Sequence, residues 1–162
     1  MSYESAKETA KKIRKALKAA FPGQKFSVRS KTYSMGSHVA VDYVDGPALA
    51  DVKAVCKQYE SAEFDGMIDL KTTPGYTDPE TGEQCNGADW VNVQRDLSFE
   101  TTKKLADEIL SEHGIVCENP VTLHKERDLE WIEIKGITID KNEPYPNDLR
   151  TAIYQAARER AF

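Results

Sequence analysis

Residues Lys25 to Asp69, KFSVRSKTYSMGSHVAVDYVDGPALADVKAVCKQYESAEFDGMID, decide the fold of this chain. Polar and apolar side chains alternate on both sides of a turn over 32–37 that contains Gly36. Alternation with a period of two predicts two strands joined as a hairpin. Apolar residues recur at helical spacing from Leu49 to Tyr59, and the segment 64–69 predicts a short strand or strand-like turn. The expected order is strand, turn, strand, helix, strand.

Two helices are expected next to and within this stretch. Ser5 and Glu8 have capping-box spacing at the start of a first helix, which runs to Ala20 because Pro22 disfavours helical geometry in the residue before it. Pro47 is expected at the first position of the second helix, where the missing N–H of proline costs no hydrogen bond.

Beyond this stretch, residues 71–88 are rich in Gly, Pro, Thr and Asp and predict a long loop. Residues 89–95 alternate and predict a strand. Ser98 is expected to cap a third helix that Gly114 ends, and Asn147 is expected to cap a last helix. One or two further strands are expected between these helices, with a turn or bulge at 135–136.

The expected element order is irregular, and hairpins imply antiparallel pairing. We therefore predict an α+β fold in which helices pack mainly on one face of an antiparallel or mixed sheet. A chain of 162 residues is expected to form a single domain over 1–162. Within it, residues 99–162 are expected to form a C-terminal extension packed on the same core as the preceding part.

Composition excludes several classes of protein. A content of 40% hydrophobic and 30% charged residues is typical of a globular chain and not of a disordered one. No apolar run approaches the roughly 18 residues needed to cross a bilayer, so no membrane partner is expected and the protein is expected in the cytoplasm of the cell that makes it. The three cysteines are scattered and odd in number, which predicts reduced thiols.

Basic residues gather near the start of the chain. Residues 1–62 hold 11 Lys and Arg against 6 Asp and Glu, whereas residues 63–162 hold 11 against 21. The polar face of the first expected helix is basic, and its residues are Lys7, Lys11, Lys12, Arg14, Lys15 and Lys18. A solvated helix face explains this pattern, and a surface that contacts phosphates or acids is the alternative. The candidate nucleic-acid-binding residues are Lys11, Arg14, Arg29, Lys31 and Tyr33.

Acidic residues crowd into a short segment near the C-terminus. They are Glu126, Asp128, Glu130 and Glu133. A solvated strand edge explains this cluster, and an acidic surface that binds a partner is the alternative.

No catalytic or metal-binding constellation is recognisable. The chain has no Gly-rich phosphate loop and no His or Cys motif of known spacing. Four aspartates, Asp42, Asp45, Asp65 and Asp69, would have to converge to hold a divalent cation, and their spacing fixes no such approach. Asp65 and Asp69 would need a partner and a substrate nearby for acid–base chemistry. We therefore predict no metal site, no cofactor and no enzymatic activity.

Several pieces of the sequence, in order, resemble one known family. They are Phe21-Pro22, Phe26 to Arg29, Asp45-Gly46-Pro47, Phe64 to Met67, and a strand that ends in Arg shortly before Ser98. This set is similar to the large polyvalent protein-associated domain 29, which occurs in proteins of phages and conjugative elements, and the resemblance covers about residues 6 to 98. Met35 departs from the small residues that the family favours in this turn, and the region beyond Ser98 is not covered.

The resemblance implies an accessory module that travels with an invading genome, of a kind linked to countering host defences. It attributes no catalytic residues to this chain. The first hypothesis is a non-enzymatic inhibitor that binds a host defence protein or nucleoprotein complex, a CRISPR effector or restriction enzyme, through the acidic cluster. The alternative is an accessory module that binds single-stranded nucleic acid through the basic helix and hairpin.

Overall fold

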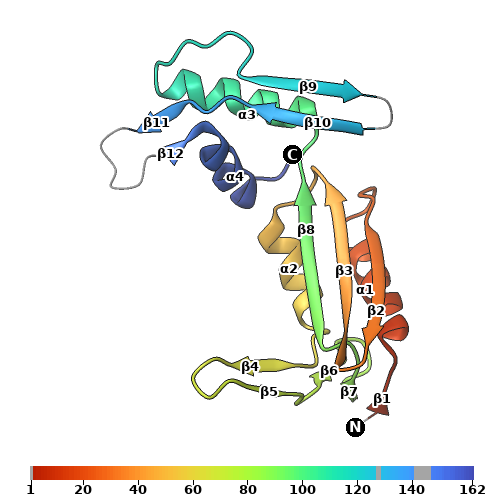
Figure 1. The fold of residues 1–162 in the computed structure, drawn as a ribbon. Helices are drawn as coiled ribbons and strands as arrows, with labels where there is room; N and C mark the ends of the chain where they lie inside the picture. Colours follow the sequence, from red (N-terminus) through yellow and green to blue (C-terminus); the bar gives the residue numbers. More distant parts are fainter. Residues whose placement is uncertain (1, 127–128, 141–146) are drawn as a thin grey trace. The chain divides into compact units, whose positions relative to one another are not determined.

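The computed structural model describes residues 2–126, 129–140 and 147–162. The described residues have an α+β fold with four helices and several small sheets, as predicted (Figure 1). They divide into two compact units, Met1–Asp96 and Leu97–Phe162. Each unit has its own cluster of buried apolar side chains. None of the helices among the described residues combines the length and the apolar character that a bilayer crossing requires.

The first unit is built on a three-stranded sheet. The strand order is β2 (Ser27–Tyr33), β3 (Gly36–Val44) and β8 (Trp90–Asp96). The β2–β3 pair is antiparallel and the β3–β8 pair is parallel, so the sheet is mixed. Helices α1 (Ala6–Ala20) and α2 (Leu49–Lys57) lie on the same face of this sheet (Figure 1). The predicted arrangement of helices on one face is confirmed in this unit.

Helix α1 begins where the capping box was predicted. The backbone N–H of Glu8 donates to Ser5 Oγ at 3.4 Å, and the backbone N–H of Ser5 donates to Glu8 Oε2 at 2.7 Å. These two bonds satisfy donors that have no partner within the helix. The apolar stripe of α1 is buried, and its members include Ala6, Ala10, Ile13 and Leu17.

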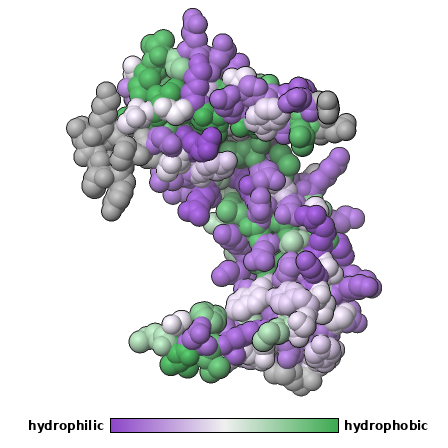
Figure 2. All heavy atoms as spheres, viewed as in Figure 1, coloured by the Kyte–Doolittle hydropathy of each residue, from purple (hydrophilic) through white to green (hydrophobic). Residues whose placement is uncertain are grey.

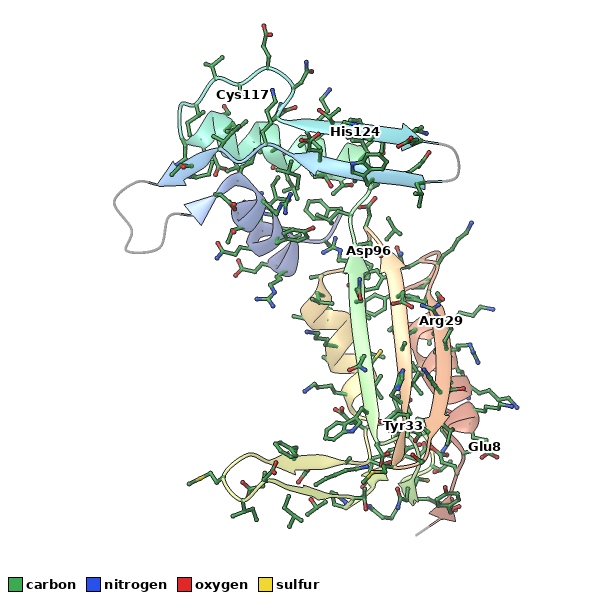
Figure 3. The ribbon with its side chains drawn as sticks, viewed as in Figure 1. Glu8, Arg29, Tyr33, Asp96, Cys117 and His124 are labelled. Carbon is green, nitrogen blue, oxygen red and sulfur yellow. The ribbon has the colours of Figure 1, made fainter. Side chains whose placement is uncertain are left out.

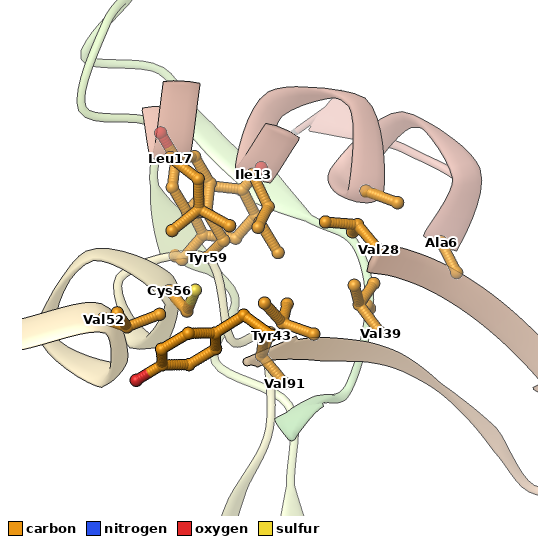
Figure 4. Packing of buried hydrophobic residues seen from close by; sticks show 14 of the residues in the cluster. Ala6, Ile13, Leu17, Val28, Val39, Tyr43, Val52, Cys56, Tyr59 and Val91 are labelled. Atoms are coloured by element: carbon orange, nitrogen blue, oxygen red, sulfur yellow. The ribbon is translucent and has the colours of Figure 1, made fainter. Parts of the chain in front are cut away.

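The core of the first unit lies between this stripe, α2 and the sheet (Figure 4). The strands contribute alternate residues, because successive side chains of a strand point to opposite faces. The largest fully buried side chains of this core include Ile13, Leu17, Val39, Val41 and Val52. Burying each Leu or Ile side chain of this core contributes about 1.5–3 kcal/mol to the stability of the unit.

The β2–β3 turn depends on Gly36. Gly36 has φ +155°, and a Cβ atom at this position would lie 2.3 Å from Asp89 Oδ2. Asp89 cannot easily withdraw, because it accepts the backbone N–H of Ser37 at 2.7 Å and pairs with Lys71 Nζ at 3.0 Å. The turn is therefore held against the start of β8 by a contact that only glycine permits.

Helix α2 begins two residues later than Pro47, and the prediction that Pro47 is the first helical residue was wrong. The helix starts at Leu49, after Ala48, whose φ of −58° and ψ of 143° are not helical. Asp45 and Gly46 have positive φ, and the Pro47 carbonyl accepts the Tyr43 hydroxyl at 3.1 Å. Pro47 therefore belongs to the turn that precedes the helix.

The prediction of a long loop over 71–88 was also wrong. Residues 63–86 of the first unit, together with the chain's first residues, contain short paired strands. They are β1 (Ser2–Tyr3), β4 (Glu63–Asp65), β5 (Leu70–Thr72), β6 (Tyr76–Thr77) and β7 (Gln84–Asn86). β6 pairs antiparallel with β7, and β7 pairs parallel with β1. The turn-rich composition conceals these strands because each has only two or three residues, too few to show a clear alternation of polar and apolar side chains.

The second unit packs two helices with two hairpins. Its elements are α3 (Phe99–Glu112), β9 (Val121–Glu126), β10 (Leu129–Ile134), β11 (Thr138–Asp140), β12 (Asn147–Asp148) and α4 (Leu149–Glu159). Ser98 caps α3 by accepting the N–H of Thr101 at 3.2 Å, as predicted. The predicted cap Asn147 was wrong, because Asp148 caps α4 by accepting the N–H of Thr151 at 2.8 Å.

Candidate functional site

The face of the β2–β3–β8 sheet that carries no helix gathers polar and aromatic side chains. We call this surface the open face, and its residues are Arg29, Lys31, Tyr33, His38, Ala40, Asp42, Trp90, Asn92 and Gln94. They alternate along each strand with the residues that enter the core. The pairing register places Lys31 beside His38 and His38 beside Trp90, so one row crosses all three strands.

Three of the five predicted nucleic-acid-binding residues lie on this open face. Arg29, Lys31 and Tyr33 are exposed on β2, and Figure 3 labels Arg29 and Tyr33 there. Arg29 Nη2 lies 2.6 Å from Asp42 Oδ2 on the neighbouring strand. The Tyr33 ring is 43% exposed, and its centroid is 6.0 Å from that of His38. The open face therefore places exposed aromatic surface beside Lys31 and beside Arg29, whose charge is balanced by Asp42.

The other two predicted residues lie on α1, which packs on the opposite face of the sheet. Arg14 Nη2 donates to the Val28 carbonyl at 2.5 Å, so its side chain reaches the backbone of the edge strand β2. Lys11 is exposed one helical turn before Arg14. The structure thus brings Arg14 to the edge of β2 but does not place either residue on the open face.

Two lysines of the predicted basic helix face are neutralised by carboxylates. Lys15 Nζ lies 2.6 Å from Glu80 Oε2. Lys12 is partly buried, and its Nζ lies 2.7 Å from Glu4 Oε2 and 2.5 Å from Asp78 Oδ2. The basic face of α1 therefore carries less positive charge than the sequence suggests, because Glu4 reaches it from just before the helix, and Asp78 and Glu80 reach it from a distant segment.

Lys12 is the centre of a polar network beneath β1, β6 and β7. Besides Glu4 and Asp78, its ammonium contacts the Tyr76 hydroxyl at 3.3 Å, and that hydroxyl donates to Glu4 Oε1. The Thr9 hydroxyl also donates to Glu4 Oε1, at 3.0 Å. Glu4, Thr9, Tyr76 and Asp78 are all buried. Each of these buried groups has a partner, as expected of polar groups removed from water.

The electrostatics of this network favour the charged pair. The hydrogen bond from Lys12 holds the pKa of the Asp78 carboxyl below its usual range, and two backbone N–H groups add to this effect. Burial opposes the charge of Lys12, but its bonds to Asp78 and Glu4 outweigh that penalty and raise the pKa of the ammonium. Burial, together with the bond to Glu4, raises the pKa of the Tyr76 hydroxyl. The Lys12 ammonium therefore stays charged and the Tyr76 hydroxyl stays protonated at neutral pH, so neither group is suited to exchange protons there.

The acidic cluster of the sequence falls on the β9–β10 hairpin of the second unit. Glu130 Oε1 lies 2.5 Å from Lys125 Nζ, and Glu133 Oε2 lies 2.6 Å from His124 Nε2. Glu126 is exposed. Asp128 lies outside the described residues. Lys125 offsets the charge of Glu130, and Glu133 is held by its contact with His124, so two of the carboxylates already have a partner on the neighbouring strand.

The remaining candidate groups do not converge. Asp42 and Asp45 lie at the end of β3, whereas Asp65 and Asp69 lie in the β4–β5 hairpin. Among the described residues, no three His, Cys, Asp or Glu side chains form a group able to hold a metal ion. Burial raises the pKa of the Cys56 thiol to about 12, as befits a core side chain.

Sequence reasoning did not assign the other open-face residues to a binding surface, and these are His38, Ala40, Asp42, Trp90, Asn92 and Gln94. The alternation within each strand indicated that these residues lie on one face of their own strand. It did not indicate which other strand would lie beside β3. That assignment needs the parallel pairing of β3 with β8, which joins residues about fifty positions apart. The long connection through α2 was the sequence signal for this pairing, because two adjacent parallel strands must be joined by a long crossover.

The comparisons with known proteins concern the first unit. A family model described as large polyvalent protein associated domain 29 matches residues 4–98, which is more than half of the chain. The matched region contains the open face and the Lys12 network. No curated protein and no solved structure matches the chain.

Proposed function

Because this chain belongs to the large polyvalent protein associated domain 29 family, we propose that it is a phage or mobile-element accessory protein that binds single-stranded nucleic acid on its open face. The observation that carries this proposal is the placement of Arg29, Lys31 and Tyr33 on one helix-free sheet face. Such surfaces bind single strands by combining cationic groups for the backbone with aromatic rings for the bases.

The register suggests how a strand would lie. Lys31 and Arg29 are exposed along the edge strand β2, where Arg14 also reaches, so phosphates would follow this edge. Tyr33 and the half-buried Trp90 lie on the two outer strands, on either side of His38 on the central strand. Bases would stack on these two aromatic rings. A formal net charge of −5 disfavours broad phosphate contact along a duplex, which makes a short single strand the better ligand.

An anisotropy titration tests this proposal. A fluorescein-labelled DNA oligonucleotide of mixed sequence would be titrated with the full chain at about 25 mM salt, where phosphate contacts are strongest. Loss of one stacked base costs about 1–3 kcal/mol, so Tyr33→Ala should weaken binding roughly tenfold. Lys31→Gln should weaken it by a smaller factor and make it less sensitive to salt.

The matched control is Lys57→Gln, which removes an exposed lysine from the end of α2 and leaves the open face intact. This variant should bind like the parent chain. Absence of binding at low salt, or equal losses in the Lys57 and Lys31 variants, would exclude the open face as the binding surface.

A second candidate function is non-enzymatic inhibition of a host defence complex through the β9–β10 hairpin. The observation that favours it is the exposure of Leu129 and Trp131 beside Glu126 on this hairpin. An exposed Trp is typical of residues that dominate binding energy in protein interfaces. His124 stacks on Trp131 with a centroid distance of 5.1 Å, which holds the indole in place.

This second candidate is tested by binding to purified CRISPR effector and restriction complexes. Trp131→Ala and Glu126→Lys should each weaken binding if the hairpin is the interface, whereas Tyr33→Ala should not. Binding that survives both hairpin substitutions would contradict this candidate and leave the open-face proposal unaffected.

A further inference from the structure

The β4–β5 hairpin of the first unit exposes large apolar side chains that the core does not use. We call residues 63–72 the finger, and its exposed apolar residues are Phe64, Met67, Ile68 and Leu70. Met67 is 96% exposed and Ile68 is 65% exposed. The finger extends away from the end of the sheet in Figure 1, and Figure 2 shows an apolar patch over it. Contiguous apolar surface of this kind marks an interaction site.

The finger is held in place although it lacks a core of its own. All six residues of its two strands are exposed, and an isolated two-stranded hairpin is marginal in water. At the tip, the N–H of Met67 donates to Asp65 Oδ1 at 2.9 Å. At the base, Lys71 Nζ pairs with Asp89 Oδ1 at 3.0 Å and so joins the finger to the sheet. The tip is therefore ordered before a partner binds, which lowers the conformational-entropy cost of binding.

The charge of the finger indicates which partner it accepts. Glu63, Asp65 and Asp69 carry three carboxylates, whereas its one cation, Lys71, is already paired with Asp89. An anionic lipid surface or a nucleic acid would repel these carboxylates. A second copy placed tip to tip would bring like charges together. A protein groove with an apolar floor and a basic rim complements both the apolar tip and the carboxylates.

We propose that the finger inserts its tip, Met67 and Ile68, into an apolar groove of a partner protein whose rim carries Lys or Arg. Asp65 and Asp69 flank the tip on either side and pair with that rim. This surface is separate from the open face residues and does not depend on nucleic-acid binding.

The test uses two labelled helical peptides as probes of groove chemistry, one of Leu and Lys and one of Leu and Glu, each with one apolar side. Their binding to the full chain would be measured by anisotropy, and the contact mapped by backbone amide NMR shifts. The Leu/Lys peptide should bind more tightly, with the shifts concentrated at 63–72. The double variant Met67→Ser, Ile68→Ser should weaken binding about tenfold, since both side chains lose their apolar contact.

Two further variants separate charge from apolar contact. Asp65→Asn with Asp69→Asn keeps the side-chain acceptor at the tip, and should reduce the preference for the Leu/Lys peptide by about fivefold or more. Met35→Ser removes a methionine that is 86% exposed from the β2–β3 turn and should leave peptide binding unchanged. The proposal is overturned if the shifts fall outside 63–72, or if the tip variant binds like the parent. It is also overturned if the tip substitutions instead abolish binding to phosphatidylglycerol vesicles or self-association in sedimentation.

Discussion

Lys12 Nζ lies 2.5 Å from Asp78 Oδ2, and this ion pair joins α1 to the turn between β6 and β7. Asp78 is 3% exposed, and it also accepts the backbone N–H groups of Glu80 and Thr81 at 2.8 Å and 3.2 Å. The pair therefore anchors the β6–β7 turn, whose composition is typical of a loop, to the folded unit. Its cost in desolvation is offset because both charges are hydrogen-bonded on several sides.

Lys12→Met should destabilise the first unit by about 2–3 kcal/mol, because Glu4 and Asp78 would remain buried without their cation. This expected loss of stability is smaller than for a fully buried pair, because the Lys12 side chain is one-third exposed and water screens its charge. Urea denaturation followed by Trp90 fluorescence, in a Trp131→Phe background, measures the change. Lys11→Met, at an exposed neighbour, should stay within about 0.5 kcal/mol. Equal losses in the two variants would contradict the role of the network.

The network also predicts how stability depends on pH. The pKa of Asp78 is below its ordinary value of 3.8 in the folded chain, so its contribution is complete above that value and is lost as pH falls through the lower folded pKa. The pKa of Tyr76 is above its ordinary value of 10.0, so its contribution is lost as pH rises beyond 10.0. Urea midpoints from pH 2 to 11 should form a plateau between these limits. Asp78→Asn should flatten the acid side, and an unchanged acid slope would contradict the assignment.

Gly36→Ala should cost about 1–3 kcal/mol, because the new Cβ would meet Asp89 Oδ2 and the residue has φ +155°. Asp89 is held by Ser37 and Lys71, so the contact cannot relax without loss of those bonds. Gly66→Ala is the control, since the nearest atom to its Cβ would be 3.9 Å away. Thermal unfolding of both variants compares them directly. A Gly36 variant as stable as the Gly66 variant would exclude this steric account.

Cysteine alkylation should proceed in a fixed order. Cys56 and Cys85 are buried, whereas Cys117 is only partly buried. Burial raises the pKa of Cys56 to about 12, so almost none of it is thiolate at pH 8. Iodoacetamide at pH 8 should label Cys117 first and the buried pair only on unfolding, as measured by peptide mass spectrometry. Early labelling of Cys56 would mean that the core opens locally.

Local signals in the sequence were sufficient for several elements. The spacing of Ser5 and Glu8 correctly placed the start of α1, and Ser98 correctly placed the start of α3. The alternation on either side of Gly36 correctly predicted the β2–β3 hairpin. These predictions succeed because each depends on hydrogen bonds or side-chain periods within a few residues.

Local signals in the sequence were misleading at the starts of α2 and α4, where more than one residue is compatible with the helix start. Pro47 and Asn147 are both favourable near a helix start, but α2 begins after Ala48 and α4 after Asp148. At the first site Tyr43 and Arg95 bind the carbonyls of the preceding turn, with Arg95 Nε donating to Asp45 at 3.1 Å. Contacts from another strand thus decide which residue of the turn enters the helix.

The sequence alone determined that this chain has an α+β fold, which helix faces are buried, and that Arg29 and Lys31 share one side of a strand. Only the tertiary structure decided that His38 and Trp90 join them, that Lys12 meets Asp78, and that the finger stays outside the core. The reason is physical: side-chain period is a property of the local backbone, whereas strand order and ion pairing depend on which distant segments exclude water from one another.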